Sequence, residues 1–251
     1  MNPNGLFTVY SVAEVCQENA RTKTLLFANP LEGAQPGQYV MAWLPGVGEK
    51  PFSISNADPL ALTVADVGPV SHALSQLGRS DQVWIRGPLG HGFELIDRFH
   101  LLVGGGYGAA PLHFLARMAL QQGHKVGICL GAKTKEDLIM VEAFEQMGCP
   151  VYLATEDGSA GVKGLVTAAL ETAFWELQPR VLYACGPTGM LMAVAKYSRR
   201  RFVPAELSFE ALIRCGVGLC GSCELPEDLC RMLGLPGGFL VCHDGPVCTL
   251  G

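Results

Sequence analysis

Short runs of apolar and β-branched residues follow one another closely over residues 6–98, and turns that contain glycine, proline or asparagine separate them. Runs of this length and spacing are typical of strands in an all-β domain. The sequence therefore predicts a small antiparallel barrel or sandwich here, with one helix at residues 71–77. The expected strands cover residues 7–15, 22–28, 38–43, 52–55, 61–67 and 82–86.

From residue 99 the pattern changes to predicted strands that alternate with predicted helices. The expected strands are residues 100–103, 125–130, 150–155 and 180–185, and the expected helices are residues 110–121, 136–147, 162–171 and 189–200. Alternation of this kind implies parallel βαβ units. We therefore expect a doubly wound α/β domain that binds a nucleotide.

The composition favours a globular protein and excludes several classes of partner. Hydrophobic residues make up 49% of the chain and charged residues 16%, a balance that disordered chains do not show. The net charge is −5 and the only basic tract is residues 199–201, so we expect no nucleic-acid partner. No apolar run reaches the ~18 residues of a membrane span, and residues 1–5 do not resemble a signal peptide. We therefore expect a soluble, cytoplasmic protein without a membrane partner.

Six of the ten cysteines lie in the C-terminal tail, which the sequence sets apart as a third module. Cys215, Cys220 and Cys223 have the C-x4-C-x2-C spacing by which plant-type ferredoxins bind a two-iron, two-sulfur (2Fe-2S) cluster, with a fourth cysteine further along. The glycines between them let the backbone approach a cluster closely. A structural zinc site is the alternative, although it usually has two C-x2-C pairs or one pair with two histidines. The candidates for the fourth ligand are Cys230, Cys242 and Cys248, which all lie downstream. Of these we choose Cys242.

Two glycine-containing loops follow predicted strands of the α/β domain. The first contains Gly104, Gly105, Gly106 and Gly108, and the second is the segment 185–189. Loops of this kind let a dinucleotide approach the first turn of a helix at the carboxyl edge of a sheet. A glycine turn is common in any α/β domain, but two such loops at one edge favour a nucleotide site.

The barrel segment carries a third candidate motif, Lys50-Pro51-Phe52-Ser53, which is followed by glycine turns at residues 68–71 and 87–93. A cation for phosphate, an aromatic face for a ring and a hydroxyl for a ring nitrogen could bind the edge of a flavin. Judged on these residues alone, an ordinary barrel strand with two glycine turns is the simpler interpretation.

In this order, the three segments resemble the ferredoxin–NADP reductase superfamily, and most closely the iron–sulfur electron-transfer subunits of NAD-dependent (type B) dihydroorotate dehydrogenases. The resemblance covers about residues 6–248, and its most specific parts are residues 87–93, 154–159, 184–187 and 242–247. It implies a multidomain α+β protein with three parts. These are an FAD-binding β-barrel at residues 1–98, an NAD-binding doubly wound α/β domain at residues 99–205 and an iron–sulfur module at residues 206–251.

By this resemblance, Lys50 would meet the FAD phosphates, Phe52 would pack on the flavin, and the Ser53 hydroxyl would approach flavin N5. Further FAD-binding residues would be Pro51, Thr63, Val64, Ala65, Gly68, Val70 and Ser71, the last two through backbone N–H groups. Two positions depart from the family, because Lys50 replaces the usual arginine and Ala65 stands where a basic residue is common.

The resemblance also implies an NAD site with Cys185 close to the nicotinamide, which makes Ser53 and Cys185 the candidate catalytic residues. The nucleotide would contact Gly104, Gly105, Gly106, Gly108, Gly186 and Pro187. Glu156 and Asp157 would repel a 2′-phosphate and so favour NADH, whereas Lys133 and Lys135 favour the opposite. The cluster ligands would be Cys215, Cys220, Cys223 and Cys242.

The activity implied by the resemblance is electron transfer in pyrimidine biosynthesis. Dihydroorotate would be oxidised in a separate FMN-containing catalytic subunit, and the electrons would pass through the cluster and FAD of this chain to NAD+. The two subunits would form a heterotetramer with two copies of each. The same module could instead serve a hydrogenase, a sulfite reductase or a transhydrogenase. A zinc-bearing binding module without turnover is the alternative from a different class.

Overall fold

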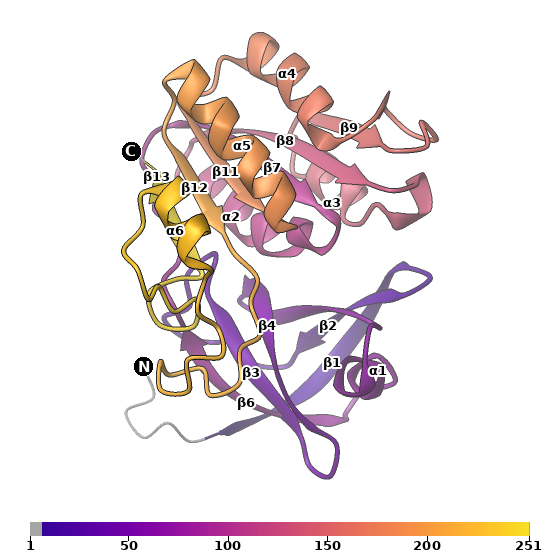
Figure 1. Ribbon diagram of the computed structural model, residues 1–251. Coiled ribbons are helices and arrows are strands. Elements are labelled where there is room, and N and C mark those ends of the chain that lie inside the picture. Colours follow the sequence, from indigo (N-terminus) through magenta and orange to yellow (C-terminus); the bar gives the residue numbers. More distant parts are fainter. Residues whose placement is uncertain (1–6, 251) are drawn as a thin grey trace.

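The computed structural model describes residues 7–250 of the chain. Residues 1–6 and Gly251 lie outside this range. Residues 1–5, for which we expected no signal peptide, are therefore not described. A closed six-stranded barrel lies next to a seven-stranded sheet that carries helices on both faces (Figure 1). This arrangement confirms the predicted combination of an antiparallel barrel with a doubly wound α/β domain. Within the described range, no helix is long and apolar enough to cross a membrane.

The barrel contains all six predicted strands, paired antiparallel in the order β1-β2-β5-β4-β3-β6. Its elements are β1 (Thr8–Asn19), β2 (Thr22–Phe27), β3 (Tyr39–Leu44), β4 (Gly48–Ala57), β5 (Leu60–Ala65), α1 (Pro69–Ser75) and β6 (Gln82–Leu89). Helix α1 begins two residues earlier than predicted, because Pro69 suits the first helical position and the Ser71 hydroxyl accepts the N–H groups of Val67 and Gly68.

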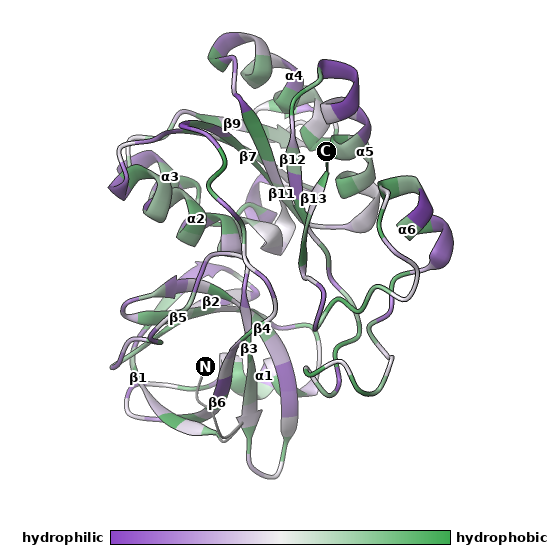
Figure 2. Cartoon of the chain, turned by 90° about the vertical axis from the view of Figure 1, so that its left-hand side faces the viewer, coloured by the Kyte–Doolittle hydropathy of each residue, from purple (hydrophilic) through white to green (hydrophobic). Residues whose placement is uncertain are grey.

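The α/β domain is built around a sheet of order β10-β9-β8-β7-β11-β12-β13, parallel except for β13. Its strands are β7 (Phe99–Gly105), β8 (Lys125–Ala132), β9 (Val151–Thr155), β10 (Val162–Lys163), β11 (Val181–Cys185), β12 (Ala205–Ser208) and β13 (Val247–Leu250). Its helices are η1 (Gly106–Gly108), α2 (Ala109–Gln121), η2 (Lys135–Asp137), α3 (Val141–Gln146), α4 (Val166–Leu177) and α5 (Thr188–Arg201). Apolar residues line the strands, and hydrophilic residues gather on the outer sides of the helices (Figure 2).

Neighbouring residues of the central strands point to opposite faces and build two separate cores. Leu101 and Val103 of β7 pack with α4 and α5, whereas Leu102 between them packs with α2 and α3. This alternation is the expected geometry of a strand that is covered on both faces.

Two predicted helices have different bounds in the structure. Residues 136–147 form η2 and α3 separately, because Leu138 is extended and Met140 is left-handed, with φ of 60°. Residues 162–171 begin as β10, which pairs with β9, and α4 starts only at Val166 and extends to Leu177. Gly164, with φ of 133°, lies at the change from strand to helix.

The cysteine-rich segment lies between two strands of the sheet, β12 and β13, which pair with each other. Strands β12 and β13 were not predicted, since each has only four residues and neither shows a clear alternation. The predicted boundary at residues 205/206 falls inside β12. Between these strands, α6 (Glu227–Leu233) and Phe239 contribute side chains to the core under α4 and α5. A segment of this length buries too little surface to form a stable core alone.

Helix α2 joins the two halves of the molecule. Leu112 and Leu115 pack against the sheet, whereas Phe114 is buried in the barrel core. Arg117 donates to the Asn56 side chain at 3.0 Å, and His113 Nδ1 lies 3.3 Å from the Ser55 carbonyl. Burial lowers the pKa of His113, so the ring is neutral and its Nδ1–H is the donor. The barrel is therefore fixed against the sheet by one helix that belongs to both cores.

Gly108 permits the turn from β7 into α2 to lie against the end of β11. A Cβ atom on Gly108 would be 1.9 Å from the Cys185 carbonyl oxygen. We expect Gly108→Ala to lower the free energy of unfolding by about 2–3 kcal/mol, as overpacking against rigid backbone does. Gly189→Ala is the matched control, because its Cβ would meet nothing within 4 Å. Equal urea midpoints for the two variants would contradict this packing.

Candidate functional site

A cleft of about 500 Å³ lies between the barrel and the α/β domain. It has the size of a typical cofactor site. The predicted site residues that line it are Lys50, Pro51, Phe52, Ser53, Thr63, Ala65, Gly68, Val70, Ser71, Gly108 and Cys185. The structure thus brings together, at one cleft, most of the residues that the resemblance assigns to FAD.

Strand β4 presents the first four of these residues to the cleft. Lys50 and Ser53 are exposed, whereas Phe52 is half-buried against the barrel core. On β5, the Thr63 hydroxyl is held by hydrogen bonds to the hydroxyls of Ser55 and Thr24, at 2.8 and 2.9 Å. Val64 between Thr63 and Ala65 does not line the cleft, because its fully buried side chain points into the barrel core.

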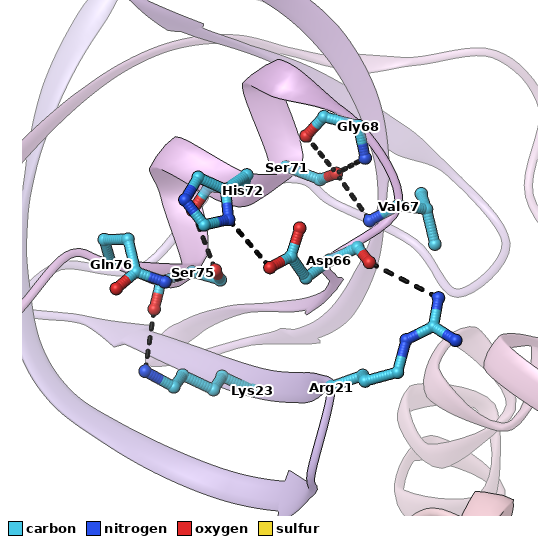
Figure 3. Close-up of polar contacts among 9 residues, drawn as sticks. All are labelled: Arg21, Lys23, Asp66, Val67, Gly68, Ser71, His72, Ser75 and Gln76. Atoms are coloured by element: carbon cyan, nitrogen blue, oxygen red, sulfur yellow. Dashed lines mark hydrogen bonds and ion pairs between the residues drawn. The ribbon is translucent and has the colours of Figure 1, made fainter.

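Helix α1 begins at the same cleft. The Ser71 hydroxyl accepts the N–H groups of Val67 and Gly68 at 3.1 and 3.0 Å, as Figure 3 shows. Val70 and Ser71 lie in the first turn, where backbone N–H groups have no acceptor within the helix. These two N–H groups are the ones that the resemblance assigns to the FAD pyrophosphate.

A second cavity, of about 620 Å³, lies along the carboxyl edge of the sheet. The predicted residues that line it are Gly105, Gly106, Glu156 and Pro187. Three others serve the local structure and do not line it. Gly104 and Gly186 allow close packing against Leu130 and Gly105, and the Asp157 carboxylate accepts the Ser159 N–H and hydroxyl.

The two cavities meet at Tyr107 and Glu210, which line both. Neither residue was predicted, although Glu210 could have been noticed from its place directly between a strand and the cysteine motif. Cys185 lies at the flavin side of this junction, and burial, followed by the charge of Glu210, raises its pKa to about 12. The Cys185 thiol therefore stays protonated at neutral pH and forms an uncharged part of the cleft lining.

The predicted cluster ligands converge in the loop between β12 and β13. Backbone N–H groups point at three of the thiols: Val217 to Cys215 at 3.5 Å, Gly218 to Cys242 at 3.2 Å, and Cys242 to Cys223 at 3.4 Å. Gly216, Gly218 and Gly221 have φ between 69° and 77°, a conformation that only glycine adopts without strain. The loop is therefore shaped around the thiols, and its N–H groups would stabilise the negative charge of thiolate ligands.

The other two downstream cysteines lie elsewhere. Cys230 is buried in α6 with its thiol directed at the Leu225 carbonyl, and Cys248 is buried in β13. Within residues 7–250, no three Cys, His, Asp or Glu side chains lie close enough to hold a single metal ion.

Two barrel side chains hold this loop against the cleft between the domains. The Tyr39 hydroxyl donates to the carbonyls of Cys242 and Gly216, at 3.0 and 3.3 Å, and Tyr39 itself lines the cleft. Arg86 donates to the Cys215 carbonyl at 2.8 Å and forms a largely buried ion pair with Glu49 at 2.7 Å. The cysteine loop and the cleft therefore share a wall.

Comparison with known proteins agrees with this arrangement. Residues 102–196 match the family described as "Oxidoreductase NAD-binding domain". A relative from Thermococcus kodakarensis, named "Probable dihydroorotate dehydrogenase B (NAD(+)), electron transfer subunit", is 39% identical over 96% of both chains. A relative of the same name from Methanocaldococcus jannaschii is 34% identical over 94% of this chain and 87% of its own.

The chain belongs to the family of dihydroorotate dehydrogenase B (NAD(+)) electron transfer subunits.

Solved structures agree with this family's fold. An NADH-dependent reduced ferredoxin-NADP oxidoreductase is 30% identical, with a TM-score of 0.82 over 96% of this chain and 88% of its own. The FAD/NAD-binding domain of nitric oxide dioxygenase from Vibrio cholerae shares the fold, with 21% identity and a TM-score of 0.66 over 79% of this chain and 94% of its own.

Removal of the Tyr39 hydroxyl tests the shared wall. We expect Tyr39→Phe to lower the free energy of unfolding by about 1–3 kcal/mol, because it leaves buried carbonyls of the cysteine loop without a donor. It should also speed the loss of iron to a chelator. Tyr10→Phe is the control, since the Tyr10 hydroxyl makes only a 3.4 Å contact with the Pro30 carbonyl. Iron loss at the same rate in both variants would show that Tyr39 does not support the loop.

The N–H groups around Cys215, that of Val217 above all, lower the pKa of its thiol to about 6. In protein freed of iron, Cys215 is therefore a thiolate at pH 7 and should react readily with iodoacetamide. The rate should fall as the pH drops through about 6, because the thiol is then protonated. Burial raises the pKa of Cys129, which should stay unmodified as the internal control. A rate midpoint near pH 9, measured by mass spectrometry, would contradict this environment.

Proposed function

We propose that this chain is the electron-transfer subunit of an NAD-dependent dihydroorotate dehydrogenase. In this proposal it carries FAD in the cleft and a 2Fe-2S cluster in the cysteine loop, and it delivers electrons to NAD+ in the second cavity. The observation that carries the proposal is the position of Tyr39, which lines the cleft and also donates to the carbonyl of Cys242. The cluster and the flavin would then lie on opposite sides of one side chain.

In the cleft, we assign the flavin phosphates to Lys50 and to the N–H groups of Val70 and Ser71. The exposed Ser53 hydroxyl and the protonated Cys185 thiol would stand on either side of the reacting ring. When bound, FAD can accept electrons one at a time and donate them as a hydride, which is the chemistry needed between an iron–sulfur cluster and NAD+. The chain's own residues would position the two rings on either side of the junction at Tyr107 and Glu210.

In the cysteine loop, we assign cluster binding to Cys215, Cys220, Cys223 and Cys242. Cys220 is exposed and Cys223 and Cys242 are buried, so one side of the site faces outward. Leu219 beside Cys220 is 85% exposed. This outward side suits transfer of electrons to or from a partner subunit.

The partner in this proposal is an FMN-containing catalytic subunit that oxidises dihydroorotate, in a cytoplasmic heterotetramer with two copies of each chain. Support comes from the relatives, which are named as electron transfer subunits of dihydroorotate dehydrogenase B. In the second cavity, Glu156 at the lining supports NADH over NADPH, because its carboxylate would repel a 2′-phosphate.

A second candidate is the same module in a different electron-transfer complex, such as a transhydrogenase. The likeness to the NADH-dependent reduced ferredoxin-NADP oxidoreductase favours it, since that protein is 30% identical over almost the whole chain. The two candidates share FAD, cluster and dinucleotide sites and differ only in the partner.

An anaerobic visible spectrum with flavin, iron and sulfide assays tests the proposal. We expect one FAD, two irons and two sulfides per chain, and bleaching when NADH is added. Cys220→Ser should keep FAD and its reduction by NADH, because Cys220 lines neither cavity, but transfer to the catalytic subunit should fall to background.

The half-buried Cys16 on β1 provides the control, and Cys16→Ser should transfer electrons at the normal rate. Unchanged transfer by Cys220→Ser would refute electron flow through the cysteine loop. Zinc without flavin in the purified protein would refute the whole proposal and leave a binding module.

A further inference from the structure

The turn between β1 and β2 extends from the barrel to the dinucleotide cavity. Asn19, Arg21 and Thr22 line this cavity together with residues at the ends of β7, β8 and β9. No sequence motif predicts this position, because the three residues belong to the barrel. Residues of both domains therefore line the second cavity.

The charges around this cavity need compensation before an anionic ligand can bind. Three carboxylates line it, those of Asp137, Glu156 and Glu210. The two cations along its described lining are Arg21 and Lys133. A dinucleotide carries two negative charges on its diphosphate, so the carboxylates would repel it unless these cations lie beside its phosphates.

Arg21 has the hydrogen-bonding capacity for this role. Its backbone N–H is bound by the Asn19 side chain at 3.0 Å, which fixes the turn. Its guanidinium makes one long contact, of 3.5 Å, with the Asp66 carbonyl (Figure 3). Within residues 7–250, neither Arg21 nor Lys133 forms an ion pair with a carboxylate. Most of the five N–H donors of Arg21 are therefore available to a ligand.

The neighbouring Thr22 belongs to the packed wall behind Arg21. Thr22 also lines the cavity, but it is only 1% exposed and its hydroxyl is buried. The Arg21 side chain, in contrast, is exposed and lines the cavity, so a ligand in the cavity can reach it.

We propose that Arg21, together with Lys133 across the cavity, binds a phosphate group of the nicotinamide dinucleotide. This inference rests on the proposed function, because it takes a dinucleotide as the occupant. The phosphate is either part of the diphosphate that NADH and NADPH share or the 2′-phosphate of NADPH. In both cases the barrel supplies a binding residue to the site on the α/β domain.

The contacts in Figure 3 connect this turn to the flavin side. Asp66, whose carbonyl accepts from Arg21, also accepts a hydrogen bond through its carboxylate from His72 of α1 at 2.8 Å. Lys23 donates to the Ser75 carbonyl at the end of the same helix, at 2.8 Å. The β1–β2 turn, the segment after β5 and helix α1 therefore form one polar unit between the two cavities.

The test is the affinity of the FAD-loaded full chain for NAD+, NADH, NADPH and ADP-ribose, measured by calorimetry under anaerobic conditions. We expect Arg21→Ala to weaken binding about tenfold and Arg21→Lys to weaken it less, because lysine keeps the charge but loses the planar fork. The salt dependence of binding should decrease in Arg21→Ala. The flavin content should be unchanged, since Arg21 lines only the dinucleotide cavity.

Arg79→Ala is the matched control, because Arg79 is an exposed barrel arginine that lines neither cavity. Equal losses for NADH and NADPH would identify the diphosphate as the ligand of Arg21, and a loss restricted to NADPH would identify the 2′-phosphate. Wild-type affinity in Arg21→Ala would overturn the inference and leave the proposed function intact. Failure of the wild-type chain to bind any dinucleotide would overturn the proposed function itself.

Discussion

The packing of helix α2 into two cores is the constraint on which the site depends. Leu112 and Leu115 on one side of the helix are buried against the sheet, and Phe114 on the other side is buried in the barrel. Rotation of the barrel would expose one of these apolar surfaces to water, which costs free energy in proportion to the area exposed. The two domains are thereby held in one arrangement, and in that arrangement their cavities meet at Tyr107 and Glu210.

The cysteine loop depends on the same arrangement. It begins after β12 and ends before β13, so the sheet fixes both of its ends. Tyr39 and Arg86 of the barrel then bind three of its carbonyl groups. A loop with many glycines has a high conformational entropy to lose, and these contacts reduce the number of conformations that remain. The thiols are thus placed by both domains, although none of them belongs to the barrel or to the helices that cover the sheet.

Much of the site could be predicted because its motifs are local. The Lys50 to Ser53 segment and the three cysteines at residues 215–223 have their spacing within a few residues, and one strand or loop positions each group. The side chain of Val64 lies in the barrel core because neighbouring residues of a strand point to opposite sides, and a motif along the chain does not show which side faces the cleft. Arg21, Tyr107 and Glu210 were missed because each has a role only where elements distant in sequence come together.

The sequence by itself determined the two domain types, most of the strands and helices, and the spacing of the cysteines in the C-terminal segment. These properties follow from periodicity, turn residues and the spacing of reactive side chains, all of which act over short stretches of chain. Only the tertiary structure decided that the cysteine segment joins the core of the α/β domain, that Tyr39 links it to the flavin cleft, and that Arg21 reaches the dinucleotide cavity. These contacts arise because apolar surfaces on α2, α5 and α6 must be buried together, and that requirement acts on the folded chain as a whole.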